Sequence, residues 1–148
     1  MIDAGQAFPN FELSDQDGQT RTNQEFLGQK VVVYFYPKDD TSGCTVEACE
    51  FNAALPEIEG AVVIGVSPDP VKSHRKFADK FGLKFPLLAD TETQLCQACG
   101  VWVEKSMYGK KYMGVERTTF LLDEKGVVTH IWRKVKPAGH AAEVRAAL

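Results

Sequence analysis

The sequence predicts an α/β fold in which a mixed sheet is flanked by helices. Two short runs, "VVVYFY" at 31–36 and "AVVIGVS" at 61–67, are apolar at nearly every position, which is typical of strands buried on both faces. The residues at 70–81 then repeat apolar side chains at helical spacing, so an amphipathic helix follows the second strand. With 148 residues, 44% of them hydrophobic, the chain can bury a substantial core, and we expect one domain over 1–148.

The first half of the chain contains two further elements. Residues 10–22 alternate around the turn "DQDG" and predict an N-terminal β-hairpin. The segment 44–55 has apolar residues at positions i, i+4, i+7 and i+11, which predicts a helix whose first turn contains Cys44. For the helix at 70–81, Asp69 is the expected N-cap.

The second half predicts a strand, a short helix, a β-hairpin and a closing helix, over 85–90, 91–100, 117–132 and 139–148. Thr91 and Gln94 have the spacing of a capping box for the short helix, and Gly100 is expected to end it. The lysine-rich segment 103–114 is expected to be a solvated loop. The whole order fits a thioredoxin-like fold: a central mixed β-sheet flanked by helices, with an N-terminal β-hairpin.

Composition and charge exclude several classes of function. Seventeen Lys and Arg against twenty Asp and Glu give a net charge of −3 without a basic block, so we expect no nucleic-acid partner. The start "MIDAGQAFPN" does not resemble a signal peptide, and no apolar run approaches the roughly 20 residues that span a membrane, so we expect a cytoplasmic protein. Four cysteines in a reducing compartment indicate redox chemistry, metal binding or burial, rather than a framework of structural disulfides.

Cys44 has the most distinctive setting of the four cysteines. It follows the first buried strand after a short loop and begins a predicted helix, so its thiol is expected at a helix N-terminus. Free N–H groups and the positive end of the helix dipole favour the thiolate there, which is the form that attacks electrophiles. Thr41, three residues earlier, and Arg117, at the start of a distant strand, could supply hydrogen-bond donors for charge that develops in the reaction.

The pattern Pro37-x-x-x-Thr41-x-x-Cys44, together with "RTTF" at Arg117, resembles the active-site signature of the peroxiredoxins, which are thiol peroxidases with a thioredoxin-like fold. "YFYPKDDTSGCTVEACEF", "FPLLAD" and "GVWVEKSMYGKKYMGVERTTFLLDEKGVV" are similar to the peroxiredoxin Q subfamily, also called bacterioferritin comigratory proteins. This likeness covers nearly the whole chain. Ser42 departs from it, because the subfamily often has proline there.

The resemblance implies a reaction and a role for each matching residue. Cys44 would be the peroxidatic cysteine, which attacks hydrogen peroxide or an organic hydroperoxide and becomes a sulfenic acid. Thr41 and Arg117 would orient the peroxide, and Pro37 would shield the pocket from water. The resemblance further implies recycling by thioredoxin or a similar reductant, no cofactor or metal, and a monomer.

Cys49 is the candidate that would resolve the sulfenic acid by forming a disulfide with Cys44, since the subfamily often has its resolving cysteine at this position. In an intact helix, Cα atoms five residues apart are separated by about 8.7 Å. A disulfide needs less than about 7 Å, so the start of the helix would have to unwind in each cycle. The alternative is that Cys49 is a partly buried spectator.

Cys96 and Cys99 form a C-x-x-C pair, which leaves two rival functions open: a general thiol-disulfide oxidoreductase, and a zinc-stabilised binding module using all four thiols. Neither rival requires Thr41 or Arg117. The plainer interpretation places Leu95, Cys96 and Cys99 on the inward face of a short helix, with a backup resolving role as a further alternative. His74 is likewise expected to be a packed side chain on an inward helix face rather than a base.

Overall fold

The protein is built around a mixed five-stranded sheet. The computed structural model describes residues 2–58 and 60–148, and its sheet has the strand order β5-β4-β3-β8-β9. Its strands are β3 (Lys30–Phe35), β4 (Ala61–Ser67), β5 (Leu87–Ala89), β8 (Thr118–Leu122) and β9 (Val128–Trp132). Strand β3 is central: it pairs in parallel with β4 and antiparallel with β8, as the predicted mixed sheet requires.

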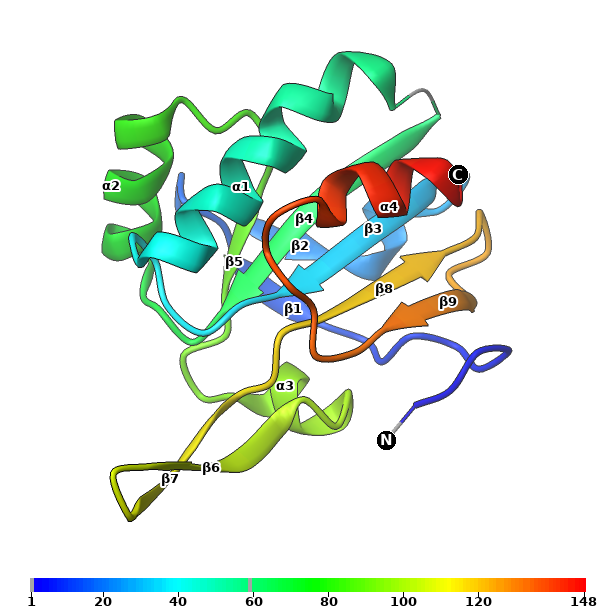
Figure 1. Cartoon of the computed structure of the whole chain (residues 1–148). Coiled ribbons are helices and arrows are strands. Elements are labelled where there is room, and N and C mark those ends of the chain that lie inside the picture. Colours follow the sequence, from blue (N-terminus) through cyan, green and yellow to red (C-terminus); the bar gives the residue numbers. More distant parts are fainter. Residues whose placement is uncertain (1, 59) are drawn as a thin grey trace.

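Helices cover both faces of this sheet, but unequally (Figure 1). They are α1 (Ser42–Ala54), α2 (Val71–Phe81), α3 (Gln94–Ala98) and α4 (His140–Ala146), with 3-10 turns at η1 (Asn23–Phe26) and η2 (Leu55–Glu57). Side chains of α1, α2 and α4 share one core, whereas α3 contributes to the core on the opposite face. No helix within the described ranges is both long enough and apolar enough to cross a membrane.

Strand β3 shows why its sequence is apolar at every position. Val32 and Tyr34 point into the core under α1, α2 and α4, while Val33 and Phe35 point into the core that includes α3. Successive side chains of a strand alternate between faces, and here both faces are covered. The result is a rigid central strand whose carboxyl end leads directly into the loop before α1.

The predicted N-terminal hairpin is confirmed. Strands β1 (Glu12–Ser14) and β2 (Thr20–Thr22) pair antiparallel, and they form a separate two-stranded sheet. The turn between them is organised by Asp15, whose carboxylate accepts the N–H groups of Asp17 and Gln19 and a hydrogen bond from Arg21.

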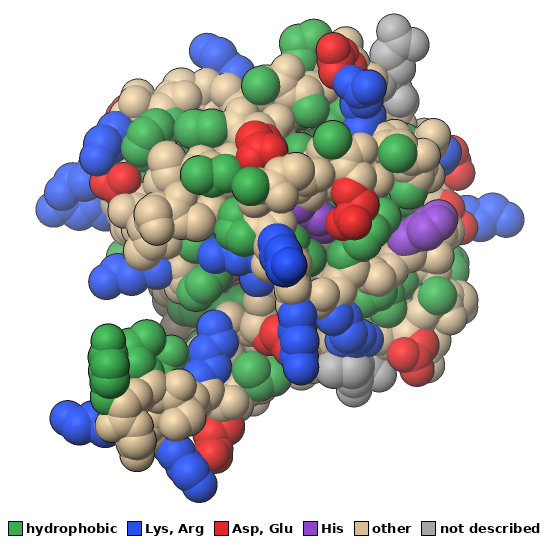
Figure 2. All heavy atoms as spheres, in the orientation of Figure 1, with side chains coloured by type: hydrophobic (Ala, Val, Ile, Leu, Met, Phe, Trp, Pro, Cys, Tyr) green, Lys and Arg blue, Asp and Glu red, His purple; other side chains and the backbone are tan. Residues whose placement is uncertain are grey.

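The prediction of a solvated loop at 103–114 is wrong. Strands β6 (Trp102–Met107) and β7 (Lys110–Val115) form a second antiparallel hairpin, joined by Tyr108 and Gly109, both at positive φ. A Tyr-Gly turn lacks the Asn-Gly or Asp-Gly signal by which such hairpins are usually recognised. Figure 2 shows the hairpin projecting from the lower left of the molecule, where Tyr108 at its tip is 98% exposed.

Two predicted helix caps are also wrong, because nearby residues take their places. Pro70, not Asp69, is the N-cap residue of α2, and the Asp69 carboxylate instead accepts the hydroxyl hydrogen of Ser67. Thr93, not Thr91, precedes α3. The first free N–H groups of α3 donate to the carboxylate of Asp90, which therefore performs the role expected of a capping side chain.

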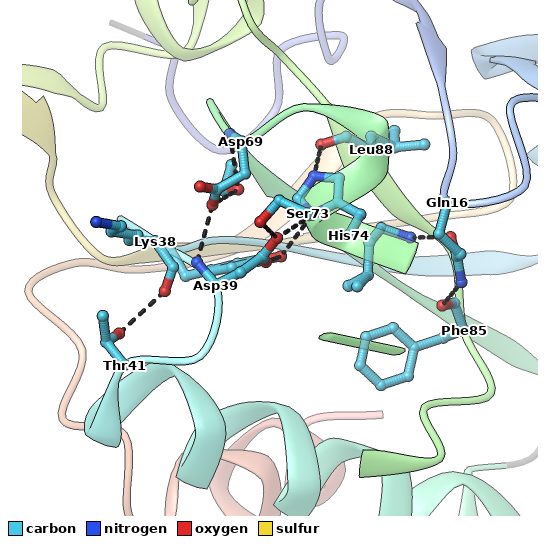
Figure 3. A network of polar contacts seen from close by, with 12 residues as sticks. Gln16, Lys38, Asp39, Thr41, Asp69, Ser73, His74, Phe85 and Leu88 are labelled. Atoms are coloured by element: carbon cyan, nitrogen blue, oxygen red, sulfur yellow. Dashed lines mark hydrogen bonds and ion pairs between the residues drawn. The ribbon is translucent and has the colours of Figure 1, made fainter. Parts of the chain in front are cut away.

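Gln16 joins the N-terminal hairpin to the edge of the main sheet (Figure 3). Its amide donates to the carbonyl of Phe85 at 2.9 Å and accepts the N–H of Leu87 at 2.8 Å, and Gln16 itself is buried.

Gln16→Ala should lower the free energy of unfolding by about 2 kcal/mol, because both buried backbone groups lose their partner. Urea denaturation measures this, with exposed Gln19→Ala as control; equal stabilities of the two variants would contradict the assignment.

Candidate active site

Cys44 lies in the first turn of α1, beyond the carboxyl end of β3. The chain crosses the loop 36–41 and enters the helix at Ser42, with Thr41 in extended conformation as the N-cap residue. Cys44 is the third residue of the helix and is 1% exposed. The predicted position at a helix N-terminus is therefore confirmed, and the unpaired N–H groups of the first turn favour negative charge on its sulfur.

Arg117 approaches Cys44 from the residue before β8. Its Nη2 donates to the Cys44 sulfur at 3.4 Å, and its Nη1 donates to Oε1 of Glu47 at 2.7 Å. Burial disfavours the charged guanidinium, but the neighbouring Glu47 and Cys44 outweigh burial and raise the pKa of Arg117. A fixed positive charge thus faces the thiol from a segment 73 residues away in the sequence.

A glycine makes this approach possible. Gly43, the second residue of α1, has no Cβ, and one added there would lie 3.3 Å from Nη2 of Arg117 and 3.2 Å from Cγ of Pro137. Such distances are tighter than ordinary van der Waals contact, so a larger residue would push the guanidinium away from Cys44. The glycine costs helix propensity but admits the cation.

Glu47 is a site residue that the sequence reasoning missed. It lies one turn after Cys44, its side chain is fully buried, and Oε2 has no hydrogen-bond partner among the residues that the structure describes. Burial raises the pKa of Glu47 to about 7, although the Arg117 guanidinium acts in the opposite direction. The available signal was its helical spacing: positions 44, 47, 48 and 51 share the inward face of α1, which makes a glutamate there unusual.

Thr41 and Pro37 lie in the loop that leads to Cys44. Thr41 is exposed, and its hydroxyl donates to the carbonyl of Lys38 at 2.9 Å. The lone pairs of the hydroxyl oxygen remain able to accept a hydrogen bond. Pro37 is half-buried directly after the buried residue Tyr36. The structure thus places both residues near the start of α1, whereas the direct contacts to the Cys44 sulfur come from Arg117.

Cys49 lies in the same unbroken helix as Cys44 and is half-buried, and both thiols are free. Helical geometry separates their Cα atoms by about 8.7 Å, beyond the roughly 7 Å limit for a disulfide. The two thiols can therefore join only after the start of α1 has lost its helical conformation.

Cys96 and Cys99 are both fully buried at α3, as the plainer interpretation of the C-x-x-C pair expects. Burial raises the pKa of both thiols well above the ordinary value, and Asp90 reinforces this effect. Buried neutral thiols are poor nucleophiles, so this pair lacks the setting of a redox dithiol.

The base of the exposed hairpin borders the same site. Lys105 on β6 is half-buried, and its aliphatic chain lies over Gly114 on the partner strand. Burial lowers the pKa of Lys105, the charge of Arg117 lowers it further, and Cys44 acts in the opposite direction. Lys105 thus shares the electrostatic environment of the thiol.

One cluster of potential metal ligands lies beside the loop. Donor atoms of Asp39, Asp69 and His74 fall within 4.8 Å of one another (Figure 3). Each already has a hydrogen-bond partner: Nε2 of His74 contacts the carbonyl of Leu88, for example, and Asp69 accepts from Ser67. The cluster is explained as a hydrogen-bonded network, and we assign no metal to it.

Comparison with known proteins identifies the class. The AhpC/TSA family matches residues 4–131, which is most of the chain, and the chain belongs to this family. Peroxiredoxin Bcp of Xanthomonas campestris is 52% identical over 138 residues, covering 92% of this chain and 86% of the relative. Peroxiredoxin Bcp of Bacillus subtilis is 47% identical over 145 residues, covering 96% and 92%.

Solved structures narrow the assignment further. The bacterioferritin comigratory protein of X. campestris, studied for alkyl peroxide reduction in trapped intermediate and ligand complexes, superposes with a TM-score of 0.91 at 48% identity, covering 98% of this chain and 96% of that one. A cysteine-to-serine variant of PrxQ from Xylella fastidiosa gives a TM-score of 0.94 at 40% identity, covering 99% and 95%. Within its family the chain is a thiol peroxidase of the peroxiredoxin Q, or Bcp, subfamily, with the thioredoxin-like fold that the sequence predicts.

Replacing Glu47 should change how the peroxide reaction depends on pH. Ionised Glu47 holds Arg117 by an ion pair, and its pKa is about 7, so protonation below pH 7 should loosen that hold and slow oxidation of Cys44. Glu47→Gln keeps a hydrogen-bonding side chain but removes the titration. We expect the wild-type rate constant to show a step near pH 7 that Glu47→Gln lacks, measured by stopped flow. Glu92→Gln, at an exposed position in the turn before α3, is the control, and an unchanged profile in Glu47→Gln would refute this role.

Gly43→Ala tests the close approach of Arg117. Alanine is the better helix former, which offsets part of the crowding against Pro137, so the change in stability should be small, yet its Cβ should displace the guanidinium. We expect the rate constant for peroxide to fall about tenfold, as is reasonable for a displacement of less than 1 Å at a reacting centre. Ser42→Ala, at the exposed first position of the helix, is the control. A Gly43→Ala protein as fast as wild type would show that the guanidinium has room to adjust.

Proposed function

We propose that Cys44 is the peroxidatic cysteine, which reduces hydrogen peroxide and organic hydroperoxides. The observation that carries the proposal is the 3.4 Å contact between the Arg117 guanidinium and the Cys44 sulfur at a helix N-terminus. The thiolate attacks one peroxide oxygen, the O–O bond breaks, and Cys44 becomes a sulfenic acid. The departing oxygen takes up a proton and leaves as water or an alcohol. Alkyl peroxide reduction by the X. campestris relative supports the organic substrates.

The residues around Cys44 have separate roles in binding the peroxide and in stabilising the charge that develops during the reaction. Arg117 and the first N–H groups of α1 stabilise the negative charge that moves from sulfur to the departing oxygen. The Thr41 hydroxyl gives its hydrogen to Lys38, so its oxygen can accept the hydrogen of a bound hydroperoxide. Pro37, half-buried after β3, limits access of water to the pocket.

Cys49 completes the cycle as the resolving cysteine. Its thiol attacks the sulfenic sulfur of Cys44, which releases water and forms an intramolecular disulfide. Because α1 holds the two residues apart, its first turns must unwind for this step. Opening a helix terminus costs far less than global unfolding.

A thioredoxin-type protein supplies the two electrons that return the disulfide to two thiols, which makes the enzyme an atypical 2-Cys peroxiredoxin. We further propose that residues 1–148 act as one domain, and that the protein works as a cytoplasmic monomer without cofactor or nucleic acid. The continuous five-stranded sheet supports the single domain, and the net charge of −3 supports the absence of a nucleic-acid partner. The rival function, a general oxidoreductase using Cys96 and Cys99, is disfavoured because burial and the neighbouring Asp90 both raise the pKa of these thiols, so neither is set up as a thiolate.

Single cysteine variants test the cycle. Cys44→Ser should lose peroxide consumption completely, because the nucleophile is gone. Cys49→Ser should still consume one equivalent of peroxide but form no intramolecular disulfide, as seen by mass spectrometry of the non-reduced protein. Cys99→Ala, which alters a buried thiol outside the cycle, should behave like wild type.

Two results would reject the proposal. Unchanged peroxide consumption in Cys44→Ser would remove Cys44 from the reaction. An intramolecular disulfide that forms at the wild-type rate in Cys49→Ser would assign resolution to another thiol.

A further inference from the structure

The segment 37–41, which carries Thr41, is attached to the rest of the molecule through one buried residue. Between Pro37 and Thr41, only Asp39 is buried, at 7% exposure. Its neighbour Asp40 has a φ of 57°, an uncommon conformation for a residue other than glycine, and is exposed. The ion pair between Asp40 and Lys80 also lies in solvent, where such pairs contribute little. The position of the loop therefore depends mainly on what holds Asp39.

Asp39 is held from several elements at once (Figure 3). Its Oδ1 accepts the hydroxyl hydrogen of Tyr36 at 2.6 Å, and Tyr36 lies directly after the central strand. Its Oδ2 accepts the hydroxyl hydrogen of Ser73 at 2.8 Å and lies 2.7 Å from Nδ1 of His74, both on α2. Its N–H donates to Asp69 at 2.8 Å, just beyond β4.

The second nitrogen of His74 fixes the arrangement of protons. Nε2 lies 3.0 Å from the carbonyl oxygen of Leu88, and a carbonyl can only accept, so Nε2 carries a hydrogen. The contact between Nδ1 and Asp39 then contains a further proton, and the pair as a whole is neutral. His74, with no exposed surface, spans from β5 to the loop through these two contacts.

Charge makes His74 the essential partner in this network. The potential ligand atoms of Asp39 and Asp69 lie within 4.8 Å of each other, so two carboxylates face one another at low exposure. Like charges at that distance repel, and the proton shared by His74 compensates one of them. The hydroxyls of Tyr36 and Ser73 donate hydrogen bonds but supply no charge.

We propose that His74, acting through Asp39, is a positioning residue that holds the loop and the first turn of α1 in the arrangement that reacts with peroxide. His74 touches neither substrate nor the Cys44 sulfur; it fixes Asp39, which lies two residues before Thr41 and five before Cys44. Without it, the loop would move and Thr41 and the first turn of α1 would lose their fixed position relative to Arg117.

The same contact should affect the second step in the opposite direction. This part rests on the proposed function, in which the start of α1 unwinds so that Cys49 can reach Cys44. A loop freed from Asp39 should unwind more readily, so loss of the contact should slow oxidation of Cys44 by peroxide and speed disulfide formation. A variant that only loosens core packing gives no specific reason for the two rates to change in opposite directions, and a packing control tests this.

The test compares two amide substitutions of His74 in the full-length reduced protein. The side-chain amide of His74→Asn lies near the position of Nδ1 and can still donate to Asp39, whereas that of His74→Gln reaches toward the Leu88 carbonyl. Phe81→Leu, on the same helix but outside the network, is the control for loss of packing. Quenched flow with hydrogen peroxide followed by mass spectrometry gives the rates at which the sulfenic acid, the disulfide and the sulfinic acid appear.

We expect His74→Gln to slow sulfenic acid formation about tenfold. Disulfide formation should be several-fold faster and the sulfinic product reduced, while His74→Asn stays near wild type. In an Asp39→Asn background, His74→Gln should have little additional effect, because residues that act as one unit are not additive.

Equal rates of sulfenic acid formation in His74→Gln and His74→Asn would overturn the proposal. The proposal would also be overturned if Phe81→Leu, at a similar loss of Tm, both slowed sulfenic acid formation and sped disulfide formation. It would be overturned as well if His74→Gln slowed sulfenic acid formation just as much in the Asp39→Asn background. A wild-type protein that forms the sulfenic acid but no disulfide with Cys49 would reject the proposed cysteine pair instead. The rates of sulfenic acid formation would then still decide the role of His74.

Discussion

The guanidinium of Arg117 joins the helix that contains Cys44 to the central sheet. It donates to the sulfur at 3.4 Å and to Glu47 at 2.7 Å, so one cation contacts two groups on the buried face of α1. A buried carboxylate and a buried thiolate would each be costly alone, and a shared cation compensates both. Gly43 follows from this constraint, because the guanidinium passes where a Cβ would stand. The position of α1 on the sheet and the chemistry of its thiol therefore have a common cause.

The site must satisfy two opposing demands. A closed first turn of α1 directs its N–H groups at the thiol, yet that same regular helix keeps Cys49 out of reach. The residues that hold the loop and the residues that must unwind lie at different positions in the sequence. Asp39, before the helix, is fixed by Tyr36, directly after β3, and by side chains of α2, whereas Ser42 and Val46, in the first turns, are exposed. Local opening can therefore be confined to the part of the helix that must change.

The sequence predicts elements that have a strong local period, and it predicts less well the contacts that depend on distant partners. Strands β3 and β4 and helix α1 follow directly from apolar patterning, and the position of Cys44 follows from them. Glu47 is different: a single glutamate among apolar residues of a helix does not reveal that an arginine 70 residues away accompanies it into the core. The contact between Asp39 and His74 spans 35 residues and was invisible for the same reason. Asp69 has the right position for a helix cap, but its carboxylate instead accepts hydrogen bonds from the N–H of Asp39 and the hydroxyl of Ser67.

The four cysteines carry the same functional group but differ in reactivity because the fold places them in different environments. Cys96 and Cys99 sit in the core behind α3, where burial keeps them protonated, although they are chemically identical to the thiol at α1. Small oxidants and alkylating reagents should therefore react slowly with Cys96 and Cys99, although the protein contains four thiols. Selectivity among thiols here does not come from exposure, since Cys44 is as buried as Cys96 and Cys99. It comes from the charge of the nearest side chain: a guanidinium faces Cys44, whereas a carboxylate lies beside the other two.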